Sequence, residues 1–165
     1  MGNLLKEKIK NKEKVLGTFF ELGSMSVIEC LGQTGLDFVI IDNEHGPFET
    51  ESTMNYVRAC DNVGLTPLVR VREVSRPAIL KPLDIGAKGL IVPCIETVEQ
   101  AKKIVEYGKF SPIGKRGFCP SRKDYWGYSH PQGQPIDVGM KHENEETLLI
   151  LQCETVGCLE NIETI

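Results

Sequence analysis

The sequence predicts an α/β fold in which helices cover a parallel sheet. Short apolar runs alternate with segments whose apolar residues recur at helical spacing, and this alternation continues along most of the 165 residues. The runs are nearly continuous in apolar residues, which is typical of strands that are buried on both faces. Right-handed βαβ units in one domain over residues 1–165 therefore give two architectures, a doubly wound open sheet or a barrel.

The predicted elements follow one another in a regular order. Strands at 15–20, 37–42, 66–71 and 89–93 are each followed by a helix, at about 24–35, 50–63, 76–86 and from about 97 onward. Gly64 is a suitable stop after the second helix, and Pro77 fits the first turn of the third helix. Thr97 and Gln100 have the spacing of a capping box at the start of the fourth helix.

The rest of the chain is less regular. KRGFC at 115–119 predicts a weaker fifth strand, and the stretch 120–140, rich in glycine, proline and aromatic residues, is expected to be a loop. TLLILQCE at 147–154 is a clear sixth strand, and LENIETI at 159–165 is typical of a helix start. The chain contains neither G-x-G-x-x-G nor a Walker loop, which disfavours a nucleotide-binding open sheet.

The composition excludes several function classes. The net charge is -4 and the basic residues are scattered, so we expect no nucleic-acid partner. No apolar run approaches the roughly 20 residues of a membrane helix, and the N-terminus lacks a signal-peptide pattern, so we expect a cytoplasmic protein without membrane contact. The six cysteines form no C-x-x-C pair and are expected to be reduced, mostly buried thiols.

Polar residues follow the second predicted strand. FVIIDNEHGPFE at 38–49 runs from apolar residues into Asp42, Glu44 and His45, and Gly46 with the following proline predicts an immediate turn. An Asp–His pair, in which the carboxylate fixes the imidazole tautomer and raises its basicity, is one interpretation. A plain polar loop is the other.

Two more charged residues occupy unusual positions. Arg70 lies within the apolar run of the third strand, where a charge is costly unless it is paired, although a surface position on an edge strand is the alternative. The planar guanidinium suits a carboxylate or an enolate oxygen. Asp84 lies near the end of the third helix, on the unfavourable side of the helix dipole, which indicates either a cationic partner or a solvated turn.

The sixth predicted strand ends in Gln152 and Glu154, which face the same way because they are two residues apart. Glu154 is either a solvated rim residue or a ligand for a hard cation such as Mg²⁺ or Mn²⁺. His45, Arg70 and Glu154 thus fall at or near the ends of three different strands. Barrel enzymes place their catalytic groups at such strand ends.

Five segments then carry a family resemblance. IDNEHGPFE, PLVRV, LDIGAKGLIVPCIETVEQAKKIV, SPIGKRGF and LQCETVGCLENIETI occur in this order between about residue 15 and the end. Together they resemble the landmarks of the HpcH/HpaI family of metal-dependent 2-oxo-acid aldolases. The resemblance implies a TIM-type (β/α)8 barrel that cleaves 4-hydroxy-2-oxo acids into pyruvate and an aldehyde. It also implies a divalent cation, Mg²⁺ or Mn²⁺ and possibly Co²⁺, that binds pyruvate.

The resemblance assigns roles to the candidate residues. His45 would be the acid and base, supported by Asp42 and Asp84, and Arg70 would hold the keto or enolate oxygen. In the same way, the resemblance makes the carboxylate of the sixth strand end, Glu154, the metal ligand and Gln152 a substrate contact. The alternative route through a lysine Schiff base is disfavoured because no predicted strand interior contains a lysine.

The resemblance also implies an incomplete barrel. The prediction covers about six of eight βα units, and the family's second carboxylate ligand, an Asp after the next strand, has no counterpart. We expect either a C-terminally truncated piece or a shortened homologue whose bare edges are covered by its N-terminal segment or by a partner, with a homo-oligomer favoured. Three functions stay open: an aldolase, an inactive assembly or interaction subunit, and a related lyase or oxaloacetate decarboxylase.

Overall fold

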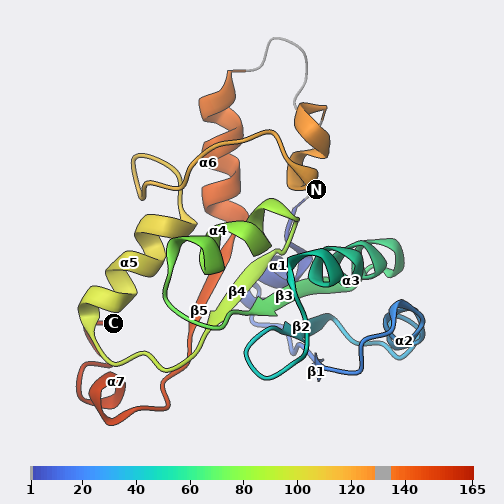
Figure 1. The fold of residues 1–165 in the computed structure, drawn as a ribbon, viewed down its shortest axis with the longest axis horizontal. Coiled ribbons are helices and arrows are strands. Elements are labelled where there is room, and N and C mark those ends of the chain that lie inside the picture. The colour runs from blue at the N-terminus through green and yellow to red at the C-terminus, as the bar shows by residue number, and fades with distance from the viewer. Residues whose placement is uncertain (1, 129–134) are drawn as a thin grey trace.

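The computed structural model describes residues 2–128 and 135–165. Its single sheet contains five parallel strands, each hydrogen-bonded to the next in chain order (Figure 1). The strands are β1 (Gly17–Phe20), β2 (Phe38–Asp42), β3 (Thr66–Arg70), β4 (Gly89–Val92) and β5 (Leu148–Leu151). The helices are α1 (Leu4–Lys10), α2 (Met25–Leu31), α3 (Thr50–Val63), α4 (Arg76–Asp84), α5 (Val98–Gly108), the 3₁₀ helix η1 (Arg122–Gly127), α6 (Ile136–Glu146) and α7 (Val156–Glu160).

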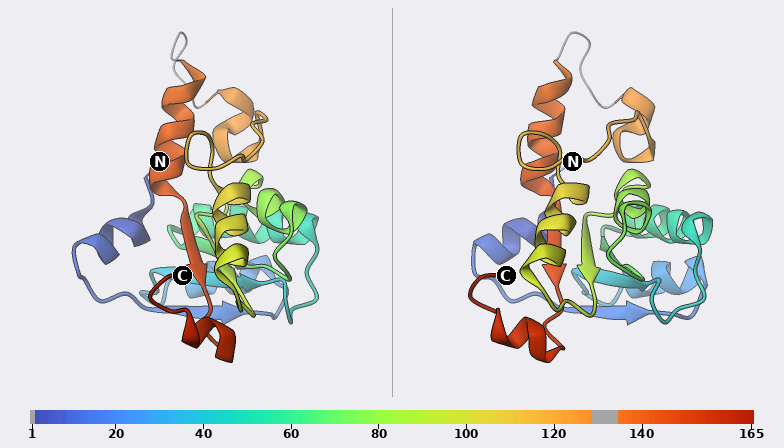
Figure 2. Two further views of the ribbon diagram at one scale, coloured as in Figure 1. Left: turned by 90° about the vertical axis from the view of Figure 1, so that its left-hand side faces the viewer. Right: turned by 60° about the vertical axis from the view of Figure 1, so that its left-hand side comes forward.

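The strand order distinguishes between the two predicted architectures. A doubly wound sheet reverses its strand order at a switch point, whereas the order here runs from β1 to β5 without reversal. Helices α3, α4 and α5 lie together on one side of this sheet (Figure 2). The arrangement is the wall of a TIM-type barrel, with an outer face covered by helices and an inner face. Within the described ranges, no helix is long and apolar enough to cross a membrane.

The predicted strand at 115–119 is wrong, so the sheet contains five strands rather than six. This segment is charged and wraps the end of α5 instead: Lys115 N–H donates to Glu106 O at 2.6 Å and Arg116 N–H donates to Lys109 O at 2.8 Å. Two apolar residues in five give it little surface to bury in a sheet. The strand predicted at 147–154 takes its place and pairs directly with β4.

The expected loop at 120–140 is also only partly correct. Residues 122–127 form η1, and α6 begins at Ile136, while residues 129–134 lie outside the described part of the chain. The other predictions hold more closely. Helix α3 begins and ends where predicted, and α5 starts with the Thr97 and Gln100 capping box.

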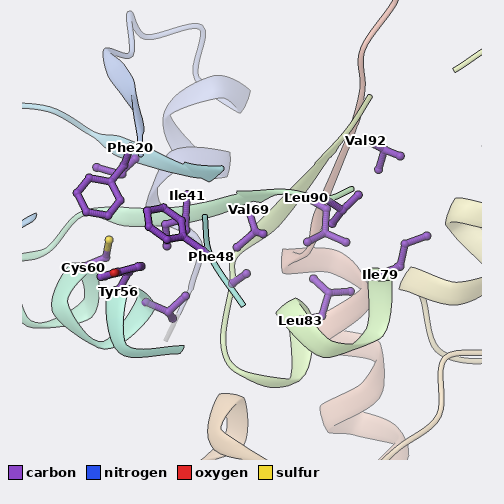
Figure 3. Packing of buried hydrophobic residues seen from close by; sticks show 14 of the residues in the cluster. Phe20, Ile41, Phe48, Tyr56, Cys60, Val69, Ile79, Leu83, Leu90 and Val92 are labelled. Atoms are coloured by element: carbon purple, nitrogen blue, oxygen red, sulfur yellow. The ribbon is translucent and has the colours of Figure 1, made fainter. Parts of the chain in front are cut away.

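The main hydrophobic core lies between the outer face of the sheet and the helices (Figure 3). Strand residues with the opposite orientation to Asp42 point into it and are fully buried: Val39, Ile41, Val69, Leu90 and Val92. Three aromatic rings, Phe20, Phe48 and Tyr56, pack together with centroids 4.8 to 5.7 Å apart. This core fixes the helices against the strands and leaves the other face of the sheet for the site.

A smaller cluster covers the inner face near the amino-terminal ends of the strands. Leu5 of α1 is buried against Ile40, Leu68 and Ile91. The helix is held in place by Asn3, whose side-chain amide donates to the backbone oxygens of Lys88 and Glu146 at 2.9 Å. Helix α1 was not predicted, and it closes the end of the inner face that lies away from the candidate site.

This packing predicts unequal effects for two neighbouring leucines. Leu5→Ala should lower the free energy of unfolding by roughly 2 to 5 kcal/mol, because it removes a buried side chain and leaves a cavity. Leu4→Ala is the matched control, since Leu4 is 60% exposed and its loss should change stability by no more than about 0.5 kcal/mol. Urea unfolding measures both values, and equal losses would contradict the assigned role of α1.

Candidate functional site

A buried ion pair links the carboxyl ends of β2 and β3. Asp42 is the last residue of β2, is fully buried, and lies opposite Arg70 in the strand register. Arg70 Nε donates to Asp42 Oδ1 at 3.0 Å, and Nη2 donates to Oδ2. The geometry is a two-point fork, the strongest form of this ion pair. The prediction that Arg70 needs a partner is confirmed.

The chain turns immediately after Asp42, and the Asp42 carboxylate stabilises this turn by accepting hydrogen bonds from its backbone. Asp42 Oδ1 accepts hydrogen bonds from the backbone N–H groups of Glu44 at 3.0 Å and His45 at 3.3 Å. A Cβ atom at Gly46 would lie 2.1 Å from the Asp42 carbonyl oxygen, so the turn requires glycine. The expected turn is therefore present, and it is held by the strand's own last residue.

The expected pair between Asp42 and the His45 imidazole is not formed in the described structure. The Asp42 carboxylate is occupied by Arg70 and by backbone N–H groups, while the His45 side chain is 68% exposed. The imidazole's acidic neighbour is Glu44, whose Oε2 lies 3.9 Å from Nε2. Asp42 thus positions the backbone of His45 and leaves its ring at the rim.

Glu44 is the residue that sequence reasoning left out of the site. Its side chain is 18% exposed, and Oε2 lies 3.4 Å from Arg70 Nε as well as near His45. The available signal was the two-residue spacing from Asp42, which predicts that both carboxylates face the same side. Glu44 connects the guanidinium and the imidazole into one charged group.

Opposing effects determine the charge of Asp42. Burial by itself raises the pKa of this carboxyl group, but hydrogen bonds from Arg70 and from the backbone of His45 and Glu44 outweigh burial and lower the pKa below its ordinary value. The hydrogen bonds that Arg70 donates to Asp42 in turn raise the pKa of Arg70. Both groups are therefore ionised at neutral pH.

Glu154 follows the carboxyl end of β5 and contacts the neighbouring loop. Its Oε1 accepts a hydrogen bond from Cys94 N–H at 2.8 Å, where Cys94 has a left-handed backbone with φ of 53°. Local desolvation and the charges of Glu154 and Glu44 raise the pKa of the Cys94 thiol. Glu44 follows β2 and Glu154 follows β5, so in the strand order the two residues stand on either side of the loop after β4, at the carboxyl edge that also carries Arg70.

The remaining two predicted residues, Gln152 and Asp84, lie at opposite edges of the sheet. Gln152 lies just beyond β5, and its buried Oε1 has no hydrogen-bond donor within the described residues. Asp84 ends α4 and accepts a hydrogen bond from Arg116 Nη2 at 2.8 Å, so of the two alternatives the structure has the cationic partner rather than the solvated turn. Helix α4 ends where the chain enters β4, so Asp84 lies at the amino-terminal edge of the sheet, opposite the edge that carries His45. It cannot support His45 of the same chain.

The described residues form no cluster of metal-ligand side chains. Within residues 2–128 and 135–165, no group of three or more His, Cys, Asp and Glu side chains is arranged to hold a metal ion. Glu154 contributes one carboxylate, with one oxygen already bound to a backbone N–H. A hard divalent cation requires about six oxygen ligands, some of them water. The free carboxylate oxygen of Glu154 has the chemistry of one such ligand.

Comparison with known proteins agrees with the geometry. The family model described as HpcH/HpaI aldolase/citrate lyase matches residues 16–165. The chain is 30% identical over its whole length to the 2-keto-3-deoxy-L-rhamnonate aldolase of Salmonella typhi. It spans 60% of the length of that relative.

Solved structures show the same correspondence. The crystal structure of an HpcH/HpaI aldolase from Desulfitobacterium hafniense DCB-2 is similar with a TM-score of 0.89 and 28% identity, over 98% of this chain and 61% of that one. The citrate synthase SbnG is similar with a TM-score of 0.85 and 30% identity, over 98% of this chain and 60% of that one. Five strands of an eight-stranded barrel correspond to about this fraction.

The ion pair makes stability depend on pH in a defined direction. Because the folded pKa of Asp42 is lowered, its contribution is fully present above the unfolded value of about 3.9 and is lost as the pH falls through the folded value. Asp42→Asn should cost about 3 kcal/mol at pH 7, since it removes the two-point carboxylate partner of Arg70 and leaves the longer contact to Glu44 at 3.4 Å. Urea midpoints from pH 7 to pH 3 should therefore fall less for this variant than for the unchanged chain.

Asp137→Asn provides the control for that comparison. Asp137 lies in the first turn of α6 and is exposed, so its loss should leave the pH dependence of the unchanged chain intact. A slope for Asp42→Asn as steep as that of the control would contradict the ionised pair.

Proposed function

Because the chain belongs to the HpcH/HpaI aldolase/citrate lyase family, we propose that it provides the Arg70 side of an active site that cleaves 4-hydroxy-2-oxo acids. The products would be pyruvate and an aldehyde. The observation that carries this proposal is the placement of one guanidinium, held by two acids, at the carboxyl edge of a barrel sheet. Barrel enzymes carry out their chemistry at this edge.

Arg70 is suited to stabilise the enolate that such a cleavage leaves behind. Breaking the bond between C3 and C4 of the substrate places negative charge on the oxygen of the pyruvate enolate. Arg70 Nε and Nη2 are committed to Asp42, which leaves Nη1 as the donor available to an incoming oxygen. The side chain is only 12% exposed and needs no rearrangement to act, so its charge is preorganised for this role.

His45 is suited to move the proton. Its imidazole lies at the rim, beside Glu44, where it is accessible to a substrate hydroxyl group. Cleavage requires removal of a proton from the 4-hydroxyl group, and the enolate carbon later requires a proton. Glu44 would hold the imidazolium after it has accepted the proton, in the role that the sequence had suggested for Asp42 and Asp84.

A divalent cation, Mg²⁺ or Mn²⁺, would be held by Glu154 together with ligands from outside the described residues. When bound, it would supply Lewis-acid polarisation of the 2-oxo group. Gln152, two residues earlier and on the same side, is placed to contact the substrate. In this proposal, Arg70 stabilises charge, His45 transfers the proton and Glu154 binds the cation.

A second candidate function is that of an interaction subunit. It is considered because residues 2–128 and 135–165 hold no group of three or more possible metal ligands. The similar structure of SbnG is that of a citrate synthase, so other reactions that form or break a carbon–carbon bond are also candidates. Oxaloacetate decarboxylation yields the same pyruvate enolate and belongs to this group.

Pyruvate release distinguishes these candidates. Pyruvate release from a 4-hydroxy-2-oxo acid is measured by coupling it to lactate dehydrogenase. We expect this release to require Mn²⁺ or Mg²⁺ and to stop on addition of EDTA. Release from oxaloacetate alone would favour the decarboxylase. A chain that binds neither Mn²⁺ nor pyruvate in titrations would be an interaction subunit.

Two substitutions should separate the roles of Arg70 and Glu154. Arg70→Ala should lower turnover by roughly 10²- to 10³-fold while Mn²⁺ affinity stays nearly unchanged, because the guanidinium acts on the enolate. Glu154→Ala should abolish both turnover and Mn²⁺ binding. Arg58→Ala, at an exposed arginine of α3, is the control. Equal loss of Mn²⁺ binding in the Arg70 and Glu154 variants would refute this division.

A further inference from the structure

Arg72 lies just after β3 and contacts both ends of the turn of residues 43–48, which carries His45 (the His45 turn). Its Nε donates a hydrogen bond to the backbone oxygen of Asn43 at 2.8 Å. Its Nη2 donates a hydrogen bond to the backbone oxygen of Phe48 at 2.7 Å. One side chain from a neighbouring strand end therefore joins two points of the chain that lie before and after His45.

The two ends of the His45 turn are fixed by the sheet, by α3 and by the core. The backbone N–H of Asn43 donates to the backbone oxygen of the last residue of β3 at 2.9 Å. The Asn43 side-chain oxygen accepts a hydrogen bond from the hydroxyl group of Thr53, a buried residue of α3, at 2.9 Å. At the other end, the Phe48 ring is buried in the main core (Figure 3). Arg72 connects these two anchored ends across the segment that lies between them.

Two oppositely charged side chains restrain the two kinds of backbone group in the His45 turn. Asp42 accepts hydrogen bonds from the N–H groups of Glu44 and His45. Arg72 donates hydrogen bonds to carbonyl oxygens at both ends of the turn. Hydrogen bonds with one ionised partner are stronger than those between neutral groups. Because the His45 imidazole is 68% exposed, its position depends mainly on how firmly its backbone is held.

The carbonyl contacts of Arg72 restrain the turn more than its ion pair does. Arg72 Nη2 also donates to Glu49 Oε1 at 2.9 Å, but the two side chains are 48% and 77% exposed. Solvent screens such a pair, so its contribution is small. The two carbonyl oxygens, in contrast, are bound by different nitrogens of one planar guanidinium. A lysine ammonium group is a single point and lacks this fork, so it cannot reproduce the same bridge.

We propose that Arg72 is a positioning residue for His45, because it holds the His45 turn in the conformation that presents the imidazole to the substrate. The inference rests on the proposed function, in which His45 moves the proton, and it adds a residue that touches neither substrate nor cation. A displacement of about 1 Å in a reacting group can lower a rate on the order of a hundredfold. Arg72 acts on the place of the imidazole through the backbone.

Arg72→Gln tests the inference by kinetics and by hydrogen exchange. With Mn²⁺ and a 4-hydroxy-2-oxo acid, kcat should fall by roughly tenfold to a hundredfold, because the imidazole is no longer held in place. KM should change by less than about twofold, since Arg72 does not touch the substrate. Amide exchange of Glu44 and His45 should become at least about tenfold faster, while exchange in β2 stays unchanged. Arg72→Lys should restore only part of kcat.

The NMR resonances of the His45 imidazole provide a readout that does not require turnover. Assigned with the His45→Gln variant, they should shift toward the values of a free histidine in Arg72→Gln, because the ring leaves its place beside Glu44. Glu49→Gln is the matched control, since it removes the charged partner of Arg72 and leaves both carbonyl contacts. It should change neither kcat, nor amide exchange in the His45 turn, nor the imidazole resonances.

Three outcomes would overturn the inference. Equal effects of Glu49→Gln and Arg72→Gln would assign the effect to the ion pair. Unchanged exchange and unchanged imidazole resonances in Arg72→Gln would show that the turn does not need the bridge. Faster exchange with unchanged kcat would make Arg72 a structural contact only. If the unchanged chain releases no pyruvate, the proposed function alone is rejected, and the imidazole resonances decide whether Arg72 positions the ring.

Discussion

The structure depends on the buried pair between Asp42 and Arg70. A carboxylate without solvent exposure and a nearly buried guanidinium are each costly, and only their two-point contact makes the arrangement favourable. The pair requires that β2 and β3 keep their register, because a shift by one residue would move one partner to the helix-covered face. The same carboxylate binds the turn that follows β2. Sheet register, turn and site geometry are thus consequences of one interaction.

The candidate metal-ligand residue Glu154 lies at the outer strand of the described sheet. Glu154 follows β5, which is the last strand of the sheet, so its neighbour on one side is the loop after β4 and on the other side is an open edge. Glu154 therefore has a protein neighbour on one side only among the described residues, and no three-ligand cluster forms there.

Local sequence patterns predicted the parts of the fold that depend on local physics. The first four strands, the helices after them and the capping box at Thr97 follow from apolar spacing and from side chains that satisfy free N–H groups. The strand at 115–119 failed because short mixed segments have no decisive periodicity. Its backbone is satisfied by the end of α5, a contact between segments that spacing cannot reveal. Helices α1 and α6 were missed because distant contacts stabilise them, as the link from Asn3 to Lys88 shows.

The sequence pattern indicated which charged residues stand in unusual positions better than it indicated their partners. A buried ion pair was one interpretation for Arg70, and a cationic partner was one of two for Asp84; both contacts exist, but the identity of each partner depends on which strands and helices meet. Asp42 was expected beside the His45 ring because the two are close in sequence. Instead, the strand register places Arg70 beside Asp42, and the acid that lies next to the imidazole is Glu44. Asp42 therefore holds the two strands and the turn together, while Glu44 lies beside the imidazole. Under the proposed function, the charge of Asp42 should matter for stability and that of Glu44 for proton transfer.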